Sequence, residues 1–270
     1  MKRGYADGQY GQVHYWEHGP LAPSGASAAL PDLYCLHATA YSGQTLLPLL
    51  QRLGDTRRVL ALDTPGYGGS DGPPAEIDFA AYADAIAEAI VATRSGSGPV
   101  DIFGYHTGAL LATELAARHP QLVRRLILIG VPYFSEADKA AWSEKLVHVT
   151  TLTESFEQFR PRWDYFITNR TPGLALNRAF DCFVDELRCY PRDWWAHKAL
   201  MEYQATPRLA LVTAPVLVLN PAASLAQFSR NAAAALPQAT LIELPGVSGA
   251  PFDLAPDVLA DAMATFLTAA

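Results

Sequence analysis

Short apolar runs alternate along the chain with longer stretches in which apolar residues recur every three or four positions. The short runs are continuous and lack the apolar–polar alternation of a sheet with one solvated face, so they predict strands buried on both faces of a parallel sheet. The predicted strands are 13–16, 33–36, 58–62, 100–103, 126–129, 216–219 and 240–244. The predicted helices are 44–53, 79–93, 106–118 and 254–267. This order indicates an α/β protein in which helices cover both faces of the sheet.

The stretch 133–211 interrupts this order. It contains no clear strand and is rich in aromatic and charged residues, which predicts a helical insertion into a core domain formed by residues 1–132 and 212–270. A second irregular stretch, 19–31, is dominated by Pro, Gly, Ala and Ser and predicts an exposed loop.

The junction between the predicted strand 100–103 and the helix after it has the sequence G-Y-H-T-G, from Gly104 to Gly108. A G-x-S-x-G pentapeptide at such a junction forms a nucleophile elbow, a sharp turn that holds its central residue in a strained conformation. Glycines flank the centre because larger side chains would collide with the neighbouring strand and helix. Here the central residue is His106, so the pattern predicts the turn without its usual serine.

Composition narrows the classes of function. Half of the residues are hydrophobic, enough for a sizeable core, and the formal net charge of −7 argues against nucleic acid as a partner. The three cysteines show no dense spacing and the first residues contain no apolar segment, so we expect a reduced, cytoplasmic chain without a signal peptide. No apolar run approaches the roughly 20 residues of a membrane helix. We find no spacing typical of a metal, phosphate or dinucleotide site, so we expect no metal and no cofactor. The oligomeric state stays open, a homodimer included.

Four further motifs carry a resemblance to a known family. LHAT at 36–39 resembles an oxyanion-loop motif that usually has the sequence H-G-x, and DTPGYGGSD at 63–71 resembles the turn D-x-P-G-x-G-x-S-D. PVLVLNP at 215–221 resembles the strand that leads to a catalytic acid, and LPGVSGAP at 244–251 resembles a loop that carries a catalytic histidine. With the elbow, these motifs span nearly the whole chain and resemble the α/β-hydrolase family. The resemblance implies the α/β-hydrolase fold, a mostly parallel central sheet flanked by helices, with the insertion as a helical cap over the active site.

The three positions of the catalytic triad depart from the family pattern. The resemblance places the serine at His106, the acid at Ala223 or Ser224, and the histidine at Gly249. None of these residues can play the part that the triad requires, in which a histidine held by an acid takes the serine proton. We therefore interpret Ser224 and Gly249 as degenerate triad positions and do not expect an acyl-serine mechanism.

Two hypotheses account for His106. In the first, a lost serine was replaced by a residue that enters positive φ more readily than most. In the second, His106 acts, because the positive end of the following helix favours the neutral imidazole, which suits acid–base work near pH 7. A nucleophilic role is a weaker alternative, since an acyl-imidazole needs a separately activated water. The backbone N–H groups of Thr107 and of Ala38 or Thr39 would supply an oxyanion hole.

Other polar residues fit either a functional role or a simple structural one. Glu136, Asp138 and Asp253 are candidate replacement acids, although each also fits a solvated carboxylate. Three arginines fit either an acidic ligand or surface charge: Arg160, Arg162 and Arg170. Asp63 is expected to order its own glycine-rich turn. Four histidines fit surface or packing positions: His14, His18, His119 and His148.

A pocket for a hydrophobic or aromatic substrate is expected over the elbow. Most aromatic residues of the insertion, with His197 among them, fit packing of cap helices onto the sheet. The residues expected to line the pocket are His37, which is mostly structural in the family, together with Tyr105, Trp163, Trp194 and Trp195.

Two functions from different classes remain open. The favoured hypothesis is a cofactor-independent enzyme that acts on a small, largely apolar or aromatic molecule by hydrolase, lyase, isomerase or cyclase chemistry, with His106 as acid or base. The alternative is a catalytically inactive relative that binds a ligand or a partner in the old cleft. A carboxylate within hydrogen-bond reach of the His106 imidazole would indicate an enzyme, and a wall of apolar side chains would indicate a relic.

Overall fold

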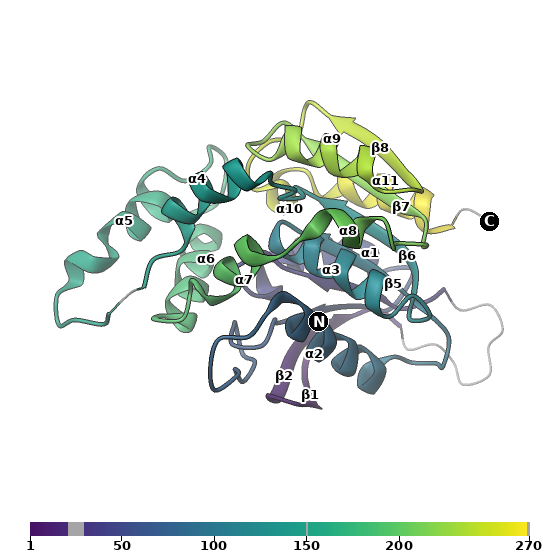
Figure 1. The fold of residues 1–270 in the computed structure, drawn as a ribbon, viewed down its shortest axis with the longest axis horizontal. Helices are drawn as coiled ribbons and strands as arrows, with labels where there is room; N and C mark the ends of the chain where they lie inside the picture. The colour runs from purple at the N-terminus through teal and green to yellow at the C-terminus, as the bar shows by residue number, and fades with distance from the viewer. Residues whose placement is uncertain (21–29, 150, 269–270) are drawn as a thin grey trace.

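The computed structural model describes residues 1–20, 30–149 and 151–268. Its centre is an eight-stranded sheet in the order β1-β2-β4-β3-β5-β6-β7-β8 (Figure 1). The strands are β1 (Lys2–Gly8), β2 (Gly11–His18), β3 (Leu33–Leu36), β4 (Val59–Leu62), β5 (Val100–Tyr105), β6 (Val123–Ile129), β7 (Val216–Pro221) and β8 (Ala239–Leu244). β2 pairs antiparallel with both β1 and β4, and every other pairing is parallel. The expected mostly parallel sheet is confirmed.

Each central strand buries side chains on both of its faces. In β3, Tyr34 and Leu36 belong to one apolar cluster, and Leu33 and Cys35 belong to another on the opposite face. The first cluster includes residues of α2 (Phe79–Thr93), α3 (Thr107–Arg118) and α9 (Ala226–Ala235), together with residues from the helices Trp195–Glu202 and Ala205–Leu209. The second cluster includes residues of α1 (Leu47–Leu53) and α11 (Pro256–Thr268), which Figure 1 shows. The continuous apolar runs in the sequence exist because neither face of these strands meets water.

The predicted elements 33–36 and 79–93 coincide with β3 and α2, while three other regions differ from the prediction. β1 was not predicted, because this edge strand is polar and mostly exposed. The predicted helix 254–267 is two helices, α10 (Pro251–Leu254) and α11, since Pro256 lacks the N–H that would continue the first one. The predicted helix 44–53 begins as a 3₁₀ turn, η1 (Gly43–Leu46), followed by α1. The predicted loop 19–31 lies largely outside the described residues.

Between β6 and β7 the described residues form helices and no strand. In chain order these are α4 (Glu136–Leu146), η2 (Phe156–Phe159), α5 (Arg160–Trp163), η3 (Asp164–Thr168), α6 (Leu176–Cys189), α7 (Trp195–Glu202) and α8 (Ala205–Leu209). α4, α5 and α6 extend to one side of the sheet, whereas α8 packs on α3 (Figure 1). We refer to residues 133–211 as the inserted segment. None of the described helices is both long and apolar enough to cross a membrane.

The Asp63 carboxylate joins three segments at the carboxyl end of β4. It accepts hydrogen bonds from the backbone N–H groups of Gly43 (2.7 Å) and Gly69 (2.8 Å), and its Oδ2 lies 2.8 Å from Nδ1 of the buried His14. Gly68 has a φ of 56° and lies so close that a Cβ would stand 2.1 Å from Asp63 Oδ2. The glycine-rich turn therefore folds around this carboxylate, as the sequence predicted, and His14 is a packing histidine.

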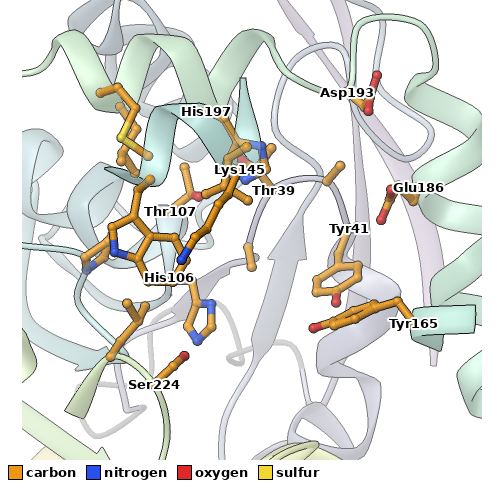
Figure 2. A pocket seen from close by; sticks show the side chains of 18 of the residues that line it. Thr39, Tyr41, His106, Thr107, Lys145, Tyr165, Glu186, Asp193, His197 and Ser224 are labelled. Atoms are coloured by element: carbon orange, nitrogen blue, oxygen red, sulfur yellow. The ribbon is translucent and has the colours of Figure 1, made fainter. Parts of the chain in front are cut away.

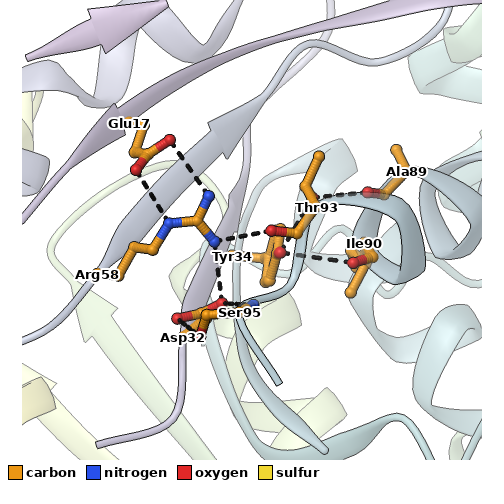
Figure 3. Close-up of polar contacts among 8 residues, drawn as sticks. All are labelled: Glu17, Asp32, Tyr34, Arg58, Ala89, Ile90, Thr93 and Ser95. Carbon is orange, nitrogen blue, oxygen red and sulfur yellow. Dashed lines mark hydrogen bonds and ion pairs between the residues drawn. The ribbon is translucent and has the colours of Figure 1, made fainter. Parts of the chain in front are cut away.

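A second buried charge network lies at the amino end of β4 (Figure 3). Arg58 donates to both carboxylate oxygens of Glu17 and to Asp32, which precedes β3. Its guanidinium also donates to the Thr93 carbonyl at the end of α2, and Asp32 accepts from the N–H and hydroxyl of Ser95. Pairing of every charge makes burial tolerable and ties β2, β3 and β4 to α2.

Replacing Asp63 with alanine should lower the free energy of unfolding by about 3–5 kcal/mol, because the N–H groups of Gly43 and Gly69 and the buried His14 ring would lose their common acceptor. Urea unfolding followed by circular dichroism measures the change. Asp257→Ala is the control, since it removes an exposed partner of Arg52 and should cost less than about 1 kcal/mol. Equal losses for the two variants would contradict the organising role of Asp63.

Candidate functional site

His106 lies at the turn between β5 and α3 in the strained conformation expected of an elbow. Its φ of 51° and ψ of −116° lie outside the regions that non-glycine residues favour. Its N–H donates to the Ile129 carbonyl of β6 at 3.0 Å. Cβ atoms at Gly104 and Gly108 would stand 2.3 Å from the carbonyl oxygens of Gly108 and Leu36. Close packing thus requires glycine at both flanking positions and fixes where His106 points.

The His106 imidazole has no hydrogen-bond partner among the residues that the structure describes, and it faces two cavities. The ring packs against Tyr105, with 4.0 Å between ring centroids, and against Gly130, where a Cβ would stand 2.8 Å from Nε2. Figure 2 shows the Ser224 side chain pointing toward the ring. The sequence analysis took a carboxylate at the ring as a sign of an enzyme and an apolar wall as a sign of an inactive relative. The structure shows neither, because no described carboxylate bonds to the ring and the cavity wall is not purely apolar.

His106 and His197 are both neutral near pH 7. Burial, with a smaller effect of the neighbouring His197, lowers the pKa of His106 to about 4. Burial also lowers the pKa of His197 to about 4, against the opposing effects of Asp193 and of the Thr39 backbone. Each ring therefore offers one N–H donor and one nitrogen acceptor.

Two backbone donors accompany His106 at the wall of one cavity. The N–H groups of Thr39 and Thr107 donate to no partner within the described ranges, and both residues line the same cavity as His106. Thr39 belongs to the loop after β3, which the close contact of Gly108 with the Leu36 carbonyl brings to the start of α3. An oxyanion or a carbonyl oxygen placed between these donors would find two unused N–H groups.

Two cavities meet at His106. The first cavity, of about 580 Å³, lies beside the two backbone donors, and the second cavity, of about 380 Å³, lies beside the degenerate triad positions. Six residues line both of them: Tyr41, Tyr105, His106, Tyr165, Phe166 and Ser224. The first cavity has an apolar wall that consists of Pro132, Phe134, Trp142, Leu146, Leu200, Met201 and Leu225. Its size and wall suit a small, largely apolar molecule.

Ser224 and Gly249, which the resemblance assigns to triad positions, supply neither an acid nor a base to His106. Ser224 follows β7 and lines both cavities. Gly249 lines the second cavity, and a Cβ there would stand 2.8 Å from Thr171 Oγ1. A side chain of the inserted segment therefore occupies the space in front of Gly249.

The charged candidates from the sequence have structural partners. Asp253 pairs with Arg178, with Oδ1 and Nε 2.7 Å apart. The remaining acids and arginines are engaged as follows: Glu136 with Lys139, Asp138 with Ser135 in the cap of α4, Arg160 with Glu157, Arg162 with Glu186 and Asp193, and Arg170 with the carbonyls of Ile167 and Leu174. The described residues contain no group of three or more His, Cys, Asp or Glu side chains placed to hold a metal ion.

Among the expected pocket residues, Tyr105 lines both cavities, but His37 lines neither. His37 is a buried structural residue. Its Nε2 accepts from the Thr64 N–H at 2.9 Å, which leaves Nδ1 to donate to the Ala38 carbonyl at 2.8 Å. Burial also lowers the pKa of His37. Both ring nitrogens bond to backbone groups, one in the loop after β3 and one in the loop after β4, so neither is left for a ligand.

The three tryptophans expected in the pocket also line neither cavity. Trp163 packs edge-on against Phe183, with ring centroids 5.4 Å apart. Trp194 is buried at the start of α7, and the Trp195 ring lies under the Arg192 guanidinium. These rings cover apolar surface within the inserted segment instead of facing the elbow.

Several polar residues of the first cavity were missed as site residues: Tyr41, Lys145, His148, Glu186, Asp193 and His197. His197, Leu200 and Met201 lie at i, i+3 and i+4 on one face of α7, and all three line the cavity. That spacing is visible in the sequence and distinguishes His197 from packing aromatics. Lys145 lies in the last turn of α4, where no sequence pattern marks it.

Comparison with known proteins identifies the family. A model of the alpha/beta hydrolase fold matches residues 33–180. A pimeloyl-[acyl-carrier protein] methyl ester esterase from Neisseria meningitidis is 40% identical over 101 residues, which cover 37% of this chain and 30% of the relative. The match thus spans about a third of the length of such curated relatives. Two solved structures show the same fold. A hydrolase from Pseudomonas aeruginosa PA01 has a TM-score of 0.80 and 19% identity, covering 99% of this chain and 98% of its own. The enol-lactonase from Burkholderia xenovorans LB400 has a TM-score of 0.76 and 20% identity, covering 98% and 100%.

The lowered pKa values of His106 and His197 predict a loss of stability on acidification. Unfolded histidine takes up a proton near pH 6.5, whereas these half-buried rings stay neutral down to about pH 4. The unfolded state thus binds more protons in this window. As the pH is lowered, the free energy of unfolding should therefore decrease by up to about 1.4 kcal/mol per pH unit for each ring. Asp185, whose pKa burial raises to about 6, acts in the opposite direction.

Single variants separate these contributions. His106→Gln and His197→Gln should each flatten the dependence of urea unfolding on pH between 6.5 and 4.5. A titration midpoint near 6.5 for the His106 ring in proton NMR would show that the site is wetter than the structure indicates.

Proposed function

Because the chain belongs to the α/β-hydrolase fold family, we propose that it is a cofactor-independent enzyme that acts on a small, largely apolar or aromatic carbonyl compound without an acyl-serine intermediate. One observation carries the proposal: a neutral imidazole without a described partner stands at the elbow, beside the N–H groups of Thr39 and Thr107. These are the parts that proton transfer next to a carbonyl requires.

In the proposed mechanism His106 moves a proton while the backbone donors hold the developing oxyanion. The unprotonated ring nitrogen takes a proton from a water that attacks the carbonyl, or from the carbon next to it. The negative charge then forms on oxygen between Thr39 and Thr107. In hydrolysis, collapse of the intermediate breaks the bond to the leaving alcohol, and the protonated ring gives its proton to that oxygen. On the enolate route the ring returns the proton to carbon. A ring with a pKa of about 4 is a weak base in the empty site. A nearby oxyanion favours the charged ring and strengthens that base when the charge develops.

The names of the relatives support a carbonyl substrate without defining it for this chain. The Neisseria protein is a methyl ester esterase, and the Burkholderia protein is an enol-lactonase. Hydrolysis by base-activated water, and lyase, isomerase or cyclase steps through an enolate, all use the same three groups. We propose a cytoplasmic protein in which the inserted segment is the cap of this site.

Binding without turnover is the second candidate function, and two observations favour it. No carboxylate among the described residues holds the His106 ring, and Thr171 occupies the space in front of Gly249. A protein with these features would retain a ligand pocket after losing the groups that hydrolysis needs.

The His106→Ala variant separates the two functions. Two probes serve: phenyl acetate, for hydrolysis, and phenylacetone, whose hydrogens next to the carbonyl exchange for solvent deuterium when a base removes them. The wild type should accelerate at least one reaction, and the variant should be slower by about 10²–10⁴-fold at an unchanged melting temperature. A fluorophosphonate should label no serine of the wild type. Equal rates for the wild type and the variant, or no acceleration of either probe, would favour binding without turnover.

Rebuilding the triad tests whether the oxyanion loop keeps hydrolase geometry. His106→Ser, Ser224→Asp and Gly249→His restore the family residues, and Thr171→Ala removes the hydroxyl that stands 2.8 Å from a Cβ at position 249. The four changes together should produce hydrolysis of p-nitrophenyl acetate and fluorophosphonate labelling of the introduced serine.

Two controls accompany this design. His106→Ser alone should be inactive, because a lone serine lacks a base. The three triad changes without Thr171→Ala should be destabilised by crowding. A folded fourfold variant with no activity above the wild type would show that Thr39 and Thr107 do not form an oxyanion hole.

A further inference from the structure

The charged groups of the first cavity are divided between two walls. Arg162 lies on one wall and pairs with both carboxylates of the cavity, Glu186 and Asp193. Figure 2 shows these two acids on the opposite side of the view from His106 and Lys145. The two carboxylates share one guanidinium, and the described residues show no ion pair between either acid and Lys145.

Lys145 places an ammonium group without a described ion-pair partner on the side of the first cavity that holds His106, Thr39 and Thr107, which we call the elbow side. Its side chain leaves the last turn of α4 and extends into the first cavity on the side of His106 (Figure 2). Its Nζ lies 5.3 Å from the centroid of the Trp142 ring, so the apolar wall lies directly beside the ammonium. No carboxylate of the described chain lies within ion-pair distance of it.

The neighbours of Lys145 add donors and no negative charge. His106 and His197 are neutral rings, and the N–H groups of Thr39 and Thr107 make no hydrogen bond within the described chain. The elbow side thus combines one ammonium and two backbone N–H groups with hydroxyl and imidazole groups only. The ammonium and the two N–H groups give this side of the cavity an excess of donors, which an acceptor-rich anion satisfies.

We infer that Lys145 binds the carboxylate of a hydrophobic carboxylic acid, whose apolar body packs on Trp142 and Phe134 while a second carbonyl lies between Thr39 and Thr107. The inference rests on the proposed function in taking this molecule as the substrate, and it adds the chemical class. A monocarboxylate fits because the elbow side holds one full positive charge, whereas a phosphate dianion would leave excess charge beside an apolar wall.

The test compares an anion with its neutral isostere. 3-Phenylpropionate and 3-phenylpropanamide have the same ring and chain and differ in the charged group, and calorimetry or NMR titration gives the dissociation constant of each. The wild type should bind the carboxylate about tenfold more tightly than the amide, and added salt should reduce the difference.

Lys145→Met should abolish this preference by weakening the carboxylate about tenfold while leaving the amide unchanged, and Lys145→Arg should restore most of it. Lys198→Met is the matched control, because Lys198 also belongs to the inserted segment, pairs with Glu76 and Glu202, and lines neither cavity. It should keep the preference of the wild type. Lys145 is exposed, so its variants should retain the wild-type melting temperature.

Three results would overturn the inference: equal affinity of the wild type for the two probes, no binding of either, or an unchanged preference in Lys145→Met. Failure here is distinguishable from failure of the proposed function. His106→Ala should keep the preference for the carboxylate even if turnover of the carbonyl probes proves absent. Conversely, loss of turnover in His106→Ala would support the mechanism even if Lys145 bound no anion.

Discussion

The close approach of four backbone segments at the elbow is the constraint on which the site depends. β5, β6, α3 and the loop after β3 meet so tightly that Gly104 and Gly108 have no room for a Cβ, and Gly130 lies directly against the His106 ring. The turn forces a positive φ on His106, at a cost of the order of 1–3 kcal/mol that the buried sheet must offset. In return, the same packing places the Thr39 and Thr107 donors beside the ring. Backbone packing thus fixes the positions of the site's groups, whichever side chain occupies the elbow.

Burial at that point decides what the side chain can do. A serine in the elbow needs a base within reach. The resemblance to the family places that base at Gly249, where a Cβ would stand 2.8 Å from Thr171 Oγ1. A histidine in the elbow contains its own base, but removal of water lowers its pKa to about 4 and weakens it. Its basicity must therefore come from the ligand, through negative charge that forms beside it. In the proposed mechanism, this requirement makes His106 and the two backbone donors depend on each other.

The fold was largely predictable from the sequence, because strands buried on both faces of the sheet are continuous apolar runs, which are easy to recognise. β3 and α2 show this, and so does the Asp63 turn, whose glycines are dictated by one carboxylate. β1 was missed because an exposed edge strand is held by backbone hydrogen bonds that leave no apolar pattern. Within the site, the elbow residues could be located by motif. The directions of Trp163, Trp194 and Trp195 could not, because they depend on how the inserted helices pack on one another. Lys145 was unpredictable for the same reason.

The excess of hydrogen-bond donors over acceptors in the first cavity indicates a ligand-binding site. A glycine at position 106 would remove the backbone strain, whereas histidine keeps the strain and exposes an imidazole without a described partner to the cavity. On the same side, Thr39, Thr107 and Lys145 supply donors that find no acceptor within the described chain. Ser224 and the neutral rings can accept, but they carry no charge to match the ammonium. Unused donors beside an apolar wall are costly unless water or a ligand satisfies them. A molecule that presents oxygen acceptors at one end and a hydrocarbon body at the other satisfies both halves of this cavity at once.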